Sequence, residues 1–236
     1  MIRRHWVAIL VAGVSTSALA DYQEVRELSL AARGVDTVSI ESGAGSLEVI
    51  GVPGADTITV TATIELTGTG DEQARQTIES DMVLSLEKDS DRAELKSWFD
   101  DGWGQGHRSH IHLEVRMPDG LHLDVDDGSG SIDIGAVRGD IMLEDGSGSL
   151  DMRDVGGNVE IDDGSGSITV TGVGGDLVIN DGSGSITVRD VSGSVTVDDG
   201  SGSIDVRNVR EDLVIVDDGS GGLDFSQIGG RVDKAS

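Results

Sequence analysis

The chain has 236 residues, 35 glycines, 2 prolines, no cysteine and an aromatic content of only 3%. So few large side chains cannot fill the thick core of an ordinary globular domain, and the absence of cysteine excludes a disulfide framework. The formal net charge of −27 argues against nucleic acid as a partner and favours cations or basic proteins, although exposed charge also serves solubility.

Residues 1–20 have the pattern of a secretory signal peptide. Arg3 and Arg4 supply the positive start, an apolar run follows at Trp6–Val14, and residues 18–20 form a small-residue cleavage site. The apolar run is much shorter than the roughly 20 residues that cross a bilayer, which disfavours a membrane anchor. No later stretch has the length and apolarity of a span, so we expect the mature chain to lack a transmembrane segment and to be periplasmic or secreted.

Residues 21–120 predict a strand-rich segment that starts with a degenerate copy of the repeat found later in the chain. The expected elements are a first coil around Val38–Val49, a strand at Thr57–Ile64, a short helix at Asp71–Ile78 capped by Asp71, a hairpin of Met82–Leu86 with Ala93–Trp98, and a strand at Ile111–Met117. We expect this segment to supply the first coils and the N-terminal cap of a larger stack, because stacked repeats need a polar end.

Residues 121–236 repeat one phrase, DGSGS, which ends as DGSGG. Its Asp-Gly pairs begin at Asp127, Asp145, Asp163, Asp181, Asp199 and Asp218, so the period is 18 residues four times and 19 once. A fixed period of this size indicates stacked structural units. One added residue near Val216 explains the longer step, and a β-bulge would absorb it without disturbing the stack.

Each repeat contains two short stretches with apolar residues two apart, such as Ile132 with Ile134 and Ile141 with Leu143, separated by turns of Gly, Ser, Asn and Asp. That spacing is the strand period, and no helix fits it. Stacking the coils about 4.8 Å apart would pair each strand with its copy and bury a continuous apolar column. The sequence therefore predicts an all-β fold: a single-stranded β-solenoid, or β-helix, with coils of about 18 residues and a right-handed sense.

The whole pattern resembles a known bacterial family. A leader, a strand-rich segment with a short helix, the turn Met117–Gly120 and an array of Gly-Ser-Ile/Leu-x-Val coils are similar to the β-strand-repeat family of unknown function called putative adhesins. The resemblance extends from about Val35 to the end of the chain. It implies a solenoid fold and an adhesin-like role at the cell envelope, and it supplies no catalytic or binding motif.

The aspartates that open the DGSGS turns are the strongest local signal. Asp and Gly are preferred in tight turns, and turn formation without a metal is the favoured interpretation. Stacked coils would also place these carboxylates in one column, where like charges repel one another and attract a cation. Calcium accepts carboxylate oxygens in irregular geometry, so the candidate calcium ligands are Asp127, Asp145, Asp163, Asp181, Asp199 and Asp218. No other cofactor is predicted.

The segment between the hairpin and the next strand carries Trp98, Phe99 and Trp103 among glycines. Exposed aromatic side chains are frequent at interfaces, and they are equally suited to plugging the end of a solenoid. Both alternatives stay open.

Two further groups of residues are weaker candidates for a metal site or a catalytic site. His107, His110 and His112, with Asp100 or Asp101, could chelate zinc, but three histidines without a clear fourth ligand favour an exposed strand face. A row of outward carboxylates could supply acid and base groups for polysaccharide cleavage. Its members are Asp133, Asp151, Asp205 and Asp224, and Thr169 and Thr187 interrupt the row. No long loop covers that row with a pocket, so a solvated face is favoured and we predict no enzymatic activity.

The sequence thus predicts a non-enzymatic, extracytoplasmic β-solenoid, adhesin-like or otherwise interacting with the cell envelope through an acidic surface. A cationic protein or peptide, or a glycan, is the expected partner. One alternative is a polysaccharide-binding or polysaccharide-active β-helix, and another is a structural protein stiffened by calcium.

Overall fold

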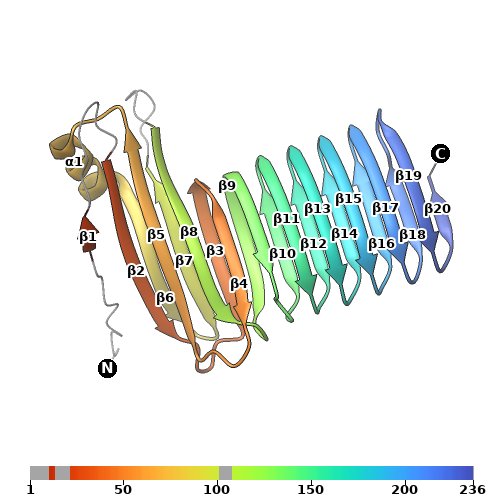
Figure 1. Ribbon diagram of the computed structural model, residues 1–236, viewed down its shortest axis with the longest axis horizontal. Coiled ribbons are helices and arrows are strands. Elements are labelled where there is room, and N and C mark those ends of the chain that lie inside the picture. The colour runs from red at the N-terminus through yellow and green to blue at the C-terminus, as the bar shows by residue number, and fades with distance from the viewer. Residues whose placement is uncertain (1–10, 14–21, 101–107, 236) are drawn as a thin grey trace.

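Each 18-residue repeat forms one coil that contributes a strand to each of two facing sheets (Figure 1). The computed structural model describes residues 11–13, 22–100 and 108–235. Sheet A contains β11 (Gly148–Val155), β13 (Gly166–Val173), β15 (Gly184–Val191), β17 (Gly202–Val209) and β19 (Gly222–Ile228). Sheet B contains β10 (Ile141–Asp145), β12 (Val159–Asp163), β14 (Leu177–Asp181), β16 (Val195–Asp199), β18 (Leu213–Asp217) and β20 (Val232–Lys234). The predicted β-solenoid is confirmed.

The coils stack in parallel and in register. Leu143 of β10 pairs with Ile161 of β12, which in turn pairs with Ile179 of β14. Because the same slots of each repeat hold Ile, Val, Leu or Met, the two sheets enclose a thin column of these side chains that is almost inaccessible to solvent. This packing explains how the chain forms a core with so few aromatic residues.

The N-terminal segment extends both sheets. The long strand β9 (His122–Gly135) passes from sheet B into sheet A, and β3 (Thr37–Ala44) and β4 (Leu47–Val52) form the predicted degenerate coil stacked on it in parallel. Beyond this coil, the antiparallel strands β2 (Tyr22–Ala31), β5 (Thr57–Thr67) and β8 (Arg108–Pro118) continue sheet A. The predicted hairpin, β6 (Met82–Asp89) with β7 (Arg92–Phe99), continues sheet B. The strand β1 (Val11–Gly13), inside the predicted leader, pairs with β2.

The predicted helix is present as α1 (Asp71–Asp81), which buries Ala74 and Ile78 at this end of the stack. The prediction that Asp71 caps it is wrong. Gly70 occupies the cap position without a side-chain hydrogen bond, and Asp71 lies in the first turn, where its charge favours the positive end of the helix dipole. No helix in the described part of the chain has the length and apolarity needed to cross a membrane.

The DGSGS turn forms the corner between the two sheets, and its glycines are required by close stacking. At the second glycine the φ angles are strongly positive, for example +151° at Gly148 and +152° at Gly166. A β-carbon on Gly148 would also overlap the carbonyl oxygen of Gly130 in the coil below. Only glycine combines this backbone conformation with so close an approach.

The 19-residue step is confirmed as a bulge. Val197 pairs with Ile215, and the next residue, Asp198, pairs with Asp217, so Val216 is the inserted residue. The right-handed sense of the coil stays a prediction.

We expect Gly148→Ala to lower the free energy of unfolding by at least about 2 kcal/mol, because the added methyl group is strained at positive φ and overlaps the adjacent coil. Gly120→Ala is the matched control, since an added β-carbon there meets no atom within 4 Å. Urea denaturation followed by circular dichroism measures both variants. Equal stabilities would show that the corner tolerates a side chain.

Candidate functional site

Five of the six predicted calcium ligands form a buried column at the corner of the solenoid. In the sheet B strands β10, β12, β14 and β16 the apolar residues point inward at alternate positions, and the aspartate is the next inward residue. Pairing is direct from coil to coil, as Asp145 pairs with both Asp127 and Asp163. The inner aspartate column comprises Asp127, Asp145, Asp163, Asp181 and Asp199. None of them is more than 5% exposed.

Asp218 does not join this column, although the repeat predicts it. The bulge at Val216 shifts the register just before it, and Asp218 is only partly buried. Its carboxylate forms an ion pair with the ammonium group of Lys234 at 2.5 Å.

Each inner carboxylate has a defined structural role. One oxygen accepts a hydrogen bond from the backbone N–H two residues later, with distances of 3.1 Å from Ser147 to Asp145 and 2.9 Å from Ser201 to Asp199. This is the side-chain turn that makes Asp favourable at the corner. At Asp127 the hydroxyl of Ser42 is the donor instead. The second oxygen, Oδ2, of Asp127, Asp181 and Asp199 has no hydrogen-bond partner among the described residues.

Burial without a cationic partner changes the acidity of the column. Desolvation, strengthened by the neighbouring aspartates, raises the pKa of Asp127 and of Asp181 to about 6. The same desolvation raises the pKa values of Asp145, Asp163 and Asp199 above the usual value of 3.8. The column is therefore a set of weakly acidic groups held inside a strongly acidic protein.

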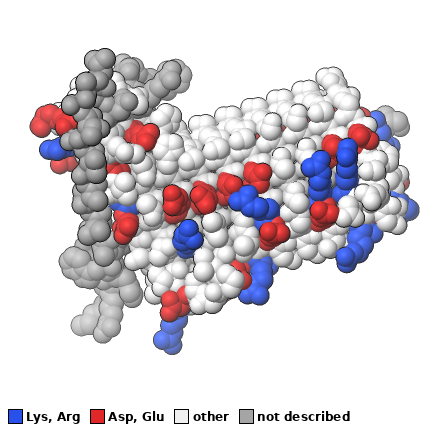
Figure 2. Space-filling model, in the orientation of Figure 1, with Lys and Arg blue, Asp and Glu red and all other residues white. Residues whose placement is uncertain are grey.

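The outer face of sheet A carries a longer row of carboxylates than the sequence predicts. Strand pairing aligns Glu114, Glu48, Asp133 and Asp151, and Figure 2 shows a row of acidic side chains on the face in view. Glu48 and Glu114 lie outside the regular repeat, which is why the spacing of the array does not reveal them. Arg153 neutralises part of this row, with ion pairs of 2.7 Å to Asp133 and 3.1 Å to Asp151.

The other two members of the predicted outward row, Asp205 and Asp224, lie near the C-terminal end of sheet A. Both form ion pairs with Arg207, at 2.8 Å and 3.5 Å respectively. Both carboxylates of this pair are therefore engaged by one guanidinium group.

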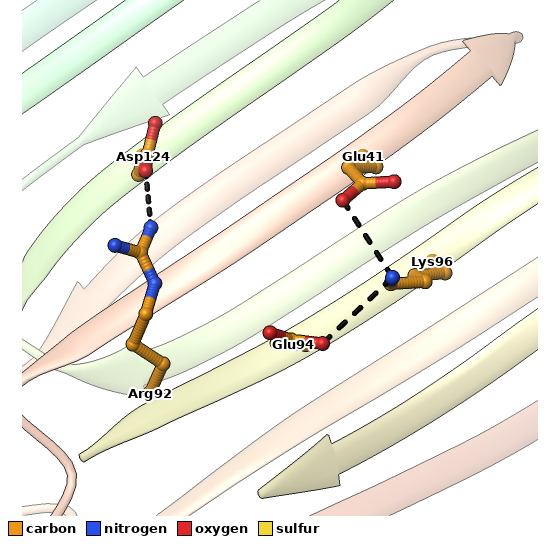
Figure 3. A network of polar contacts seen from close by, with 5 residues as sticks. All are labelled: Glu41, Arg92, Glu94, Lys96 and Asp124. Carbon is orange, nitrogen blue, oxygen red and sulfur yellow. Dashed lines mark hydrogen bonds and ion pairs between the residues drawn. The ribbon is translucent and has the colours of Figure 1, made fainter. Parts of the chain in front are cut away.

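On sheet B, charges are balanced near the hairpin and unbalanced farther along. Figure 3 shows Lys96 between Glu41 and Glu94, and Arg92 with Asp124. In the next coils the exposed residues Asp126, Glu144 and Asp162 are aligned by strand pairing. Among the residues that the structure describes, none of these three carboxylates has a basic partner within ion-pair distance.

A pocket of about 320 Å³ lies beside these carboxylates, at the turn that leads into sheet B. Its lining includes Asp124, Asp140, Glu160, Asp176 and the side chain of Met142, which is 50% exposed. We call it the acidic pocket. Sequence analysis missed it, although Met142 gave a signal: it occupies an outward slot of the strand pattern, where its neighbours in the stack are Asp124 and Glu160.

Sequence comparison now places the chain in a family. A model of the Toastrack DUF4097 family matches residues 35–228, which is most of the chain. The chain belongs to the Toastrack DUF4097 family. The match spans β3 to β19, and it confirms the resemblance predicted from the repeats. No curated protein matches the chain in sequence.

Solved structures similar to this Toastrack protein include two bacterial proteins. One is a putative adhesin from Bacteroides fragilis, with 12% identity and a TM-score of 0.43 over 89% of this chain and 97% of that protein. The other is a putative cell adhesion protein from Clostridium sporogenes, with 10% identity and a TM-score of 0.36 over 91% of this chain and 99% of that protein.

A second hollow of the Toastrack solenoid runs along the DGSGS corner. This trough has a volume of about 780 Å³ and is lined by Ser and Gly of successive coils, with His110 and His112 at its N-terminal end. The Nδ1 atom of His112 accepts the backbone N–H of Ser46 at 3.0 Å, so that nitrogen is already engaged. His107 and Asp101 of the predicted zinc group lie outside the described residues.

Two of the three predicted aromatic contact residues, Trp98 and Phe99, lie at the end of β7. Phe99 is partly buried and packs against the core. Trp98 is also partly buried, and it donates a hydrogen bond from Nε1 to Asp100 at 3.0 Å. Which of these residues contacts a partner stays a prediction. Trp103 lies outside the described residues.

In the described part of the chain, no group of three or more His, Asp or Glu residues has the geometry to hold a metal ion. Calcium binding by the aspartates therefore stays a prediction, with the unpartnered oxygens of the inner aspartate column as its best support.

We expect the thermal stability of the protein to rise as the pH falls from about 7 to about 5. The folded chain holds protons on the inner aspartates more tightly than the unfolded chain, because folding raises their pKa values, to about 6 at Asp127 and Asp181. This stabilisation is complete below the unfolded pKa and is lost as the pH rises through about 6.

The substitution Asp181→Asn tests whether the buried charge of Asp181 causes this pH dependence, since the amide keeps the acceptor oxygen but carries no charge. Above pH 7 the variant should be more stable than the parent by about 1–3 kcal/mol, and the difference should shrink at lower pH. Asp162→Asn removes one charge from the exposed face and serves as control. If both variants gain the same stability, relief of net charge, and not the buried column, is responsible.

Proposed function

We propose that this Toastrack protein is a non-enzymatic, extracytoplasmic binding protein of the adhesin type, and that it captures a cationic peptide or protein segment at the acidic pocket. The observation that carries the proposal is the combination of four carboxylates with an exposed methionine in one hollow. The leader-like pattern of residues 1–20 supports a location outside the cytoplasm.

The charges around the pocket favour a basic partner. Asp124 is paired with Arg92 and is partly compensated. The Nδ1 atom of His122 lies 3.5 Å from the Asp140 carboxylate, but it accepts the backbone N–H of Asp140 at 3.0 Å, so it donates no proton to that carboxylate. Within the described chain, Glu160 and Asp176 have no basic partner in ion-pair range. Together with the neighbouring Asp126, Glu144 and Asp162, they create a negative field that attracts Lys or Arg from a distance.

The exposed thioether of Met142 suits the alkyl part of such side chains. Lysine and arginine place an aliphatic stem against apolar surface while the charged end reaches a carboxylate. Methionine is common at surfaces that accept varied partners, because its side chain adapts to different shapes. A short basic segment that crosses the coils would therefore find both kinds of contact in one place.

Binding is favoured over catalysis by the state of the candidate acid and base groups. The outward row on sheet A is engaged by Arg153 and Arg207, and the inner aspartates are closed off from any substrate. Both hollows lie at the corners of the stack and are lined by residues of successive coils.

A glycan is the second candidate partner, favoured by the trough at the DGSGS corner. The trough presents serine hydroxyls from successive coils, which could bond to a linear chain of sugar hydroxyls. Glycan binding that is insensitive to salt and is lost in Trp103→Ala would support this alternative. A calcium-stiffened structural role is the third candidate, and a large rise in melting temperature with calcium over chelator would support it.

We expect the chain to bind an oligolysine peptide, measured by isothermal titration calorimetry, with an affinity that falls steeply as salt is raised. The double variant Glu160→Gln with Asp176→Asn should weaken binding about fivefold, since it removes two uncompensated charges from the pocket. Asp151→Asn with Asp224→Asn is the control, with the same change in net charge on sheet A. If both double variants weaken peptide binding equally, binding depends on the overall charge of the protein, and the proposal that the acidic pocket binds the peptide is refuted.

A further inference from the structure

The outward face of sheet B alternates between two kinds of coil. One kind has the pattern Asp-x-apolar where the turn enters the strand, at residues 140–142, 176–178 and 212–214. The coils between them have polar residues at both of these positions, in 158–160 and 194–196. The Asp-x-apolar segments lie 36 residues apart, which is two periods of 18. The array therefore carries a second, longer period that its DGSGS turns do not show.

The first two Asp-x-apolar segments open into the acidic pocket. Their apolar members, Met142 and Val178, both line it and are at least partly exposed. Glu160 lies between them, because strand pairing stacks it on Met142 from one side and on Val178 from the other. The pocket thus presents two apolar contacts with a carboxylate between them, and each contact has the turn aspartate of its own coil beside it.

These turn aspartates are fixed through one oxygen and open at the other. Oδ1 of Asp140 accepts the backbone N–H of Asn158, and Oδ1 of Asp176 accepts that of Ser194, both at 2.8 Å. Within the chain as described, Oδ2 of these two aspartates receives no hydrogen bond from a protein donor, since His122 uses its Nδ1 atom as an acceptor. Each carboxylate is therefore held in place with an oxygen available to a cation.

The third segment shows which kind of group takes that oxygen. Arg231 donates its backbone N–H to Oδ1 of Asp212 at 2.7 Å and a guanidinium N–H to Oδ2 at 3.2 Å. An arginine of the chain itself therefore occupies the position that is open beside Asp140 and Asp176. The chemistry of the site matches a basic side chain at each open aspartate.

The spacing of the two open segments favours one backbone conformation in the ligand. Two coils of about 4.8 Å each separate them by about 9.6 Å along the solenoid axis. Three residues of a polyproline II helix advance about 9.3 Å and return the side chain to the same face. In an extended strand every third side chain lies on the opposite face, because successive side chains alternate. Seven residues of an α-helix advance about 10.5 Å, which is about 1 Å too long.

We propose that the acidic pocket binds a proline-rich basic segment in the polyproline II conformation, with Lys or Arg at every third position. The segment runs along the solenoid axis, across the strands. Each basic side chain lays its aliphatic stem on Met142 or Val178, and its charged end reaches the turn aspartate of the same coil. The proposal rests on the proposed function, since it specifies the cationic peptide that the pocket captures.

Isothermal titration calorimetry of the purified full chain tests the spacing. A peptide of Lys-Pro-Pro repeats should bind at least about fivefold tighter than a peptide of the same composition with its lysines in one block, because only the repeats reach both segments with a preorganised backbone. A peptide of Lys-Ala-Ala repeats should also bind more weakly, since alanine restricts the backbone less than proline. If either comparison peptide binds as tightly as the Lys-Pro-Pro repeats, the proposal is wrong.

The double variant Met142→Thr with Val178→Thr tests the apolar contacts. The row already holds a threonine, Thr196, so the sheet accepts this residue. The double variant should lose the preference for the periodic peptide, while circular dichroism shows that the solenoid is retained. Val214→Thr is the matched control, because the aspartate of its segment is already engaged by Arg231, and it should keep the preference. A preference that persists in the double variant, or disappears in the control, would overturn the proposal.

Oligolysine separates this proposal from the proposed function. If oligolysine binding depends on Glu160 and Asp176 but the Lys-Pro-Pro repeats have no advantage over the block peptide, the pocket captures cations and only the spacing proposal fails. If no basic peptide binds, both proposals fail.

Discussion

The structure depends on how closely one coil can approach the next at the DGSGS corner. Strands of a parallel ladder lie about 4.8 Å apart, and a chain that turns a sharp corner must keep that spacing through the turn. The glycines achieve this, because any β-carbon at Gly148 or Gly166 would meet the backbone of the neighbouring coil. The in-register ladders, the apolar column and the alignment of every side chain along the axis all follow from this contact. A repeat whose corner accepted larger residues would have to splay its coils and interrupt both sheets.

The same corner explains why an acidic protein buries a column of carboxylates. The turn needs an acceptor for the N–H two residues later, and Asp supplies it from the last inward position of β10, β12, β14 and β16. In each such coil, the aspartate that forms the hydrogen bond of the turn is therefore also removed from solvent. Since the coils are in register, the desolvated groups also face one another, and each makes its neighbour harder to ionise. Local turn chemistry and global stacking thus combine into a feature that neither produces alone.

Much of the fold is predictable because the repeat carries redundant information. The apolar spacing, the 18-residue period and even the extra residue at Val216 each indicate the stack, and pairing of Asp198 with Asp217 confirms the bulge. The inward direction of the aspartates also follows from strand alternation, as Leu143 and Asp145 are two residues apart. The repeat does not reveal the positions at which one copy carries a different type of side chain from the others. Glu48 and Glu114 join the sheet A row from the irregular segment. The acidic pocket arises where Met142 lies between Asp124 and Glu160 in the stack. Such sites depend on neighbours across coils, and one repeat taken alone does not contain them.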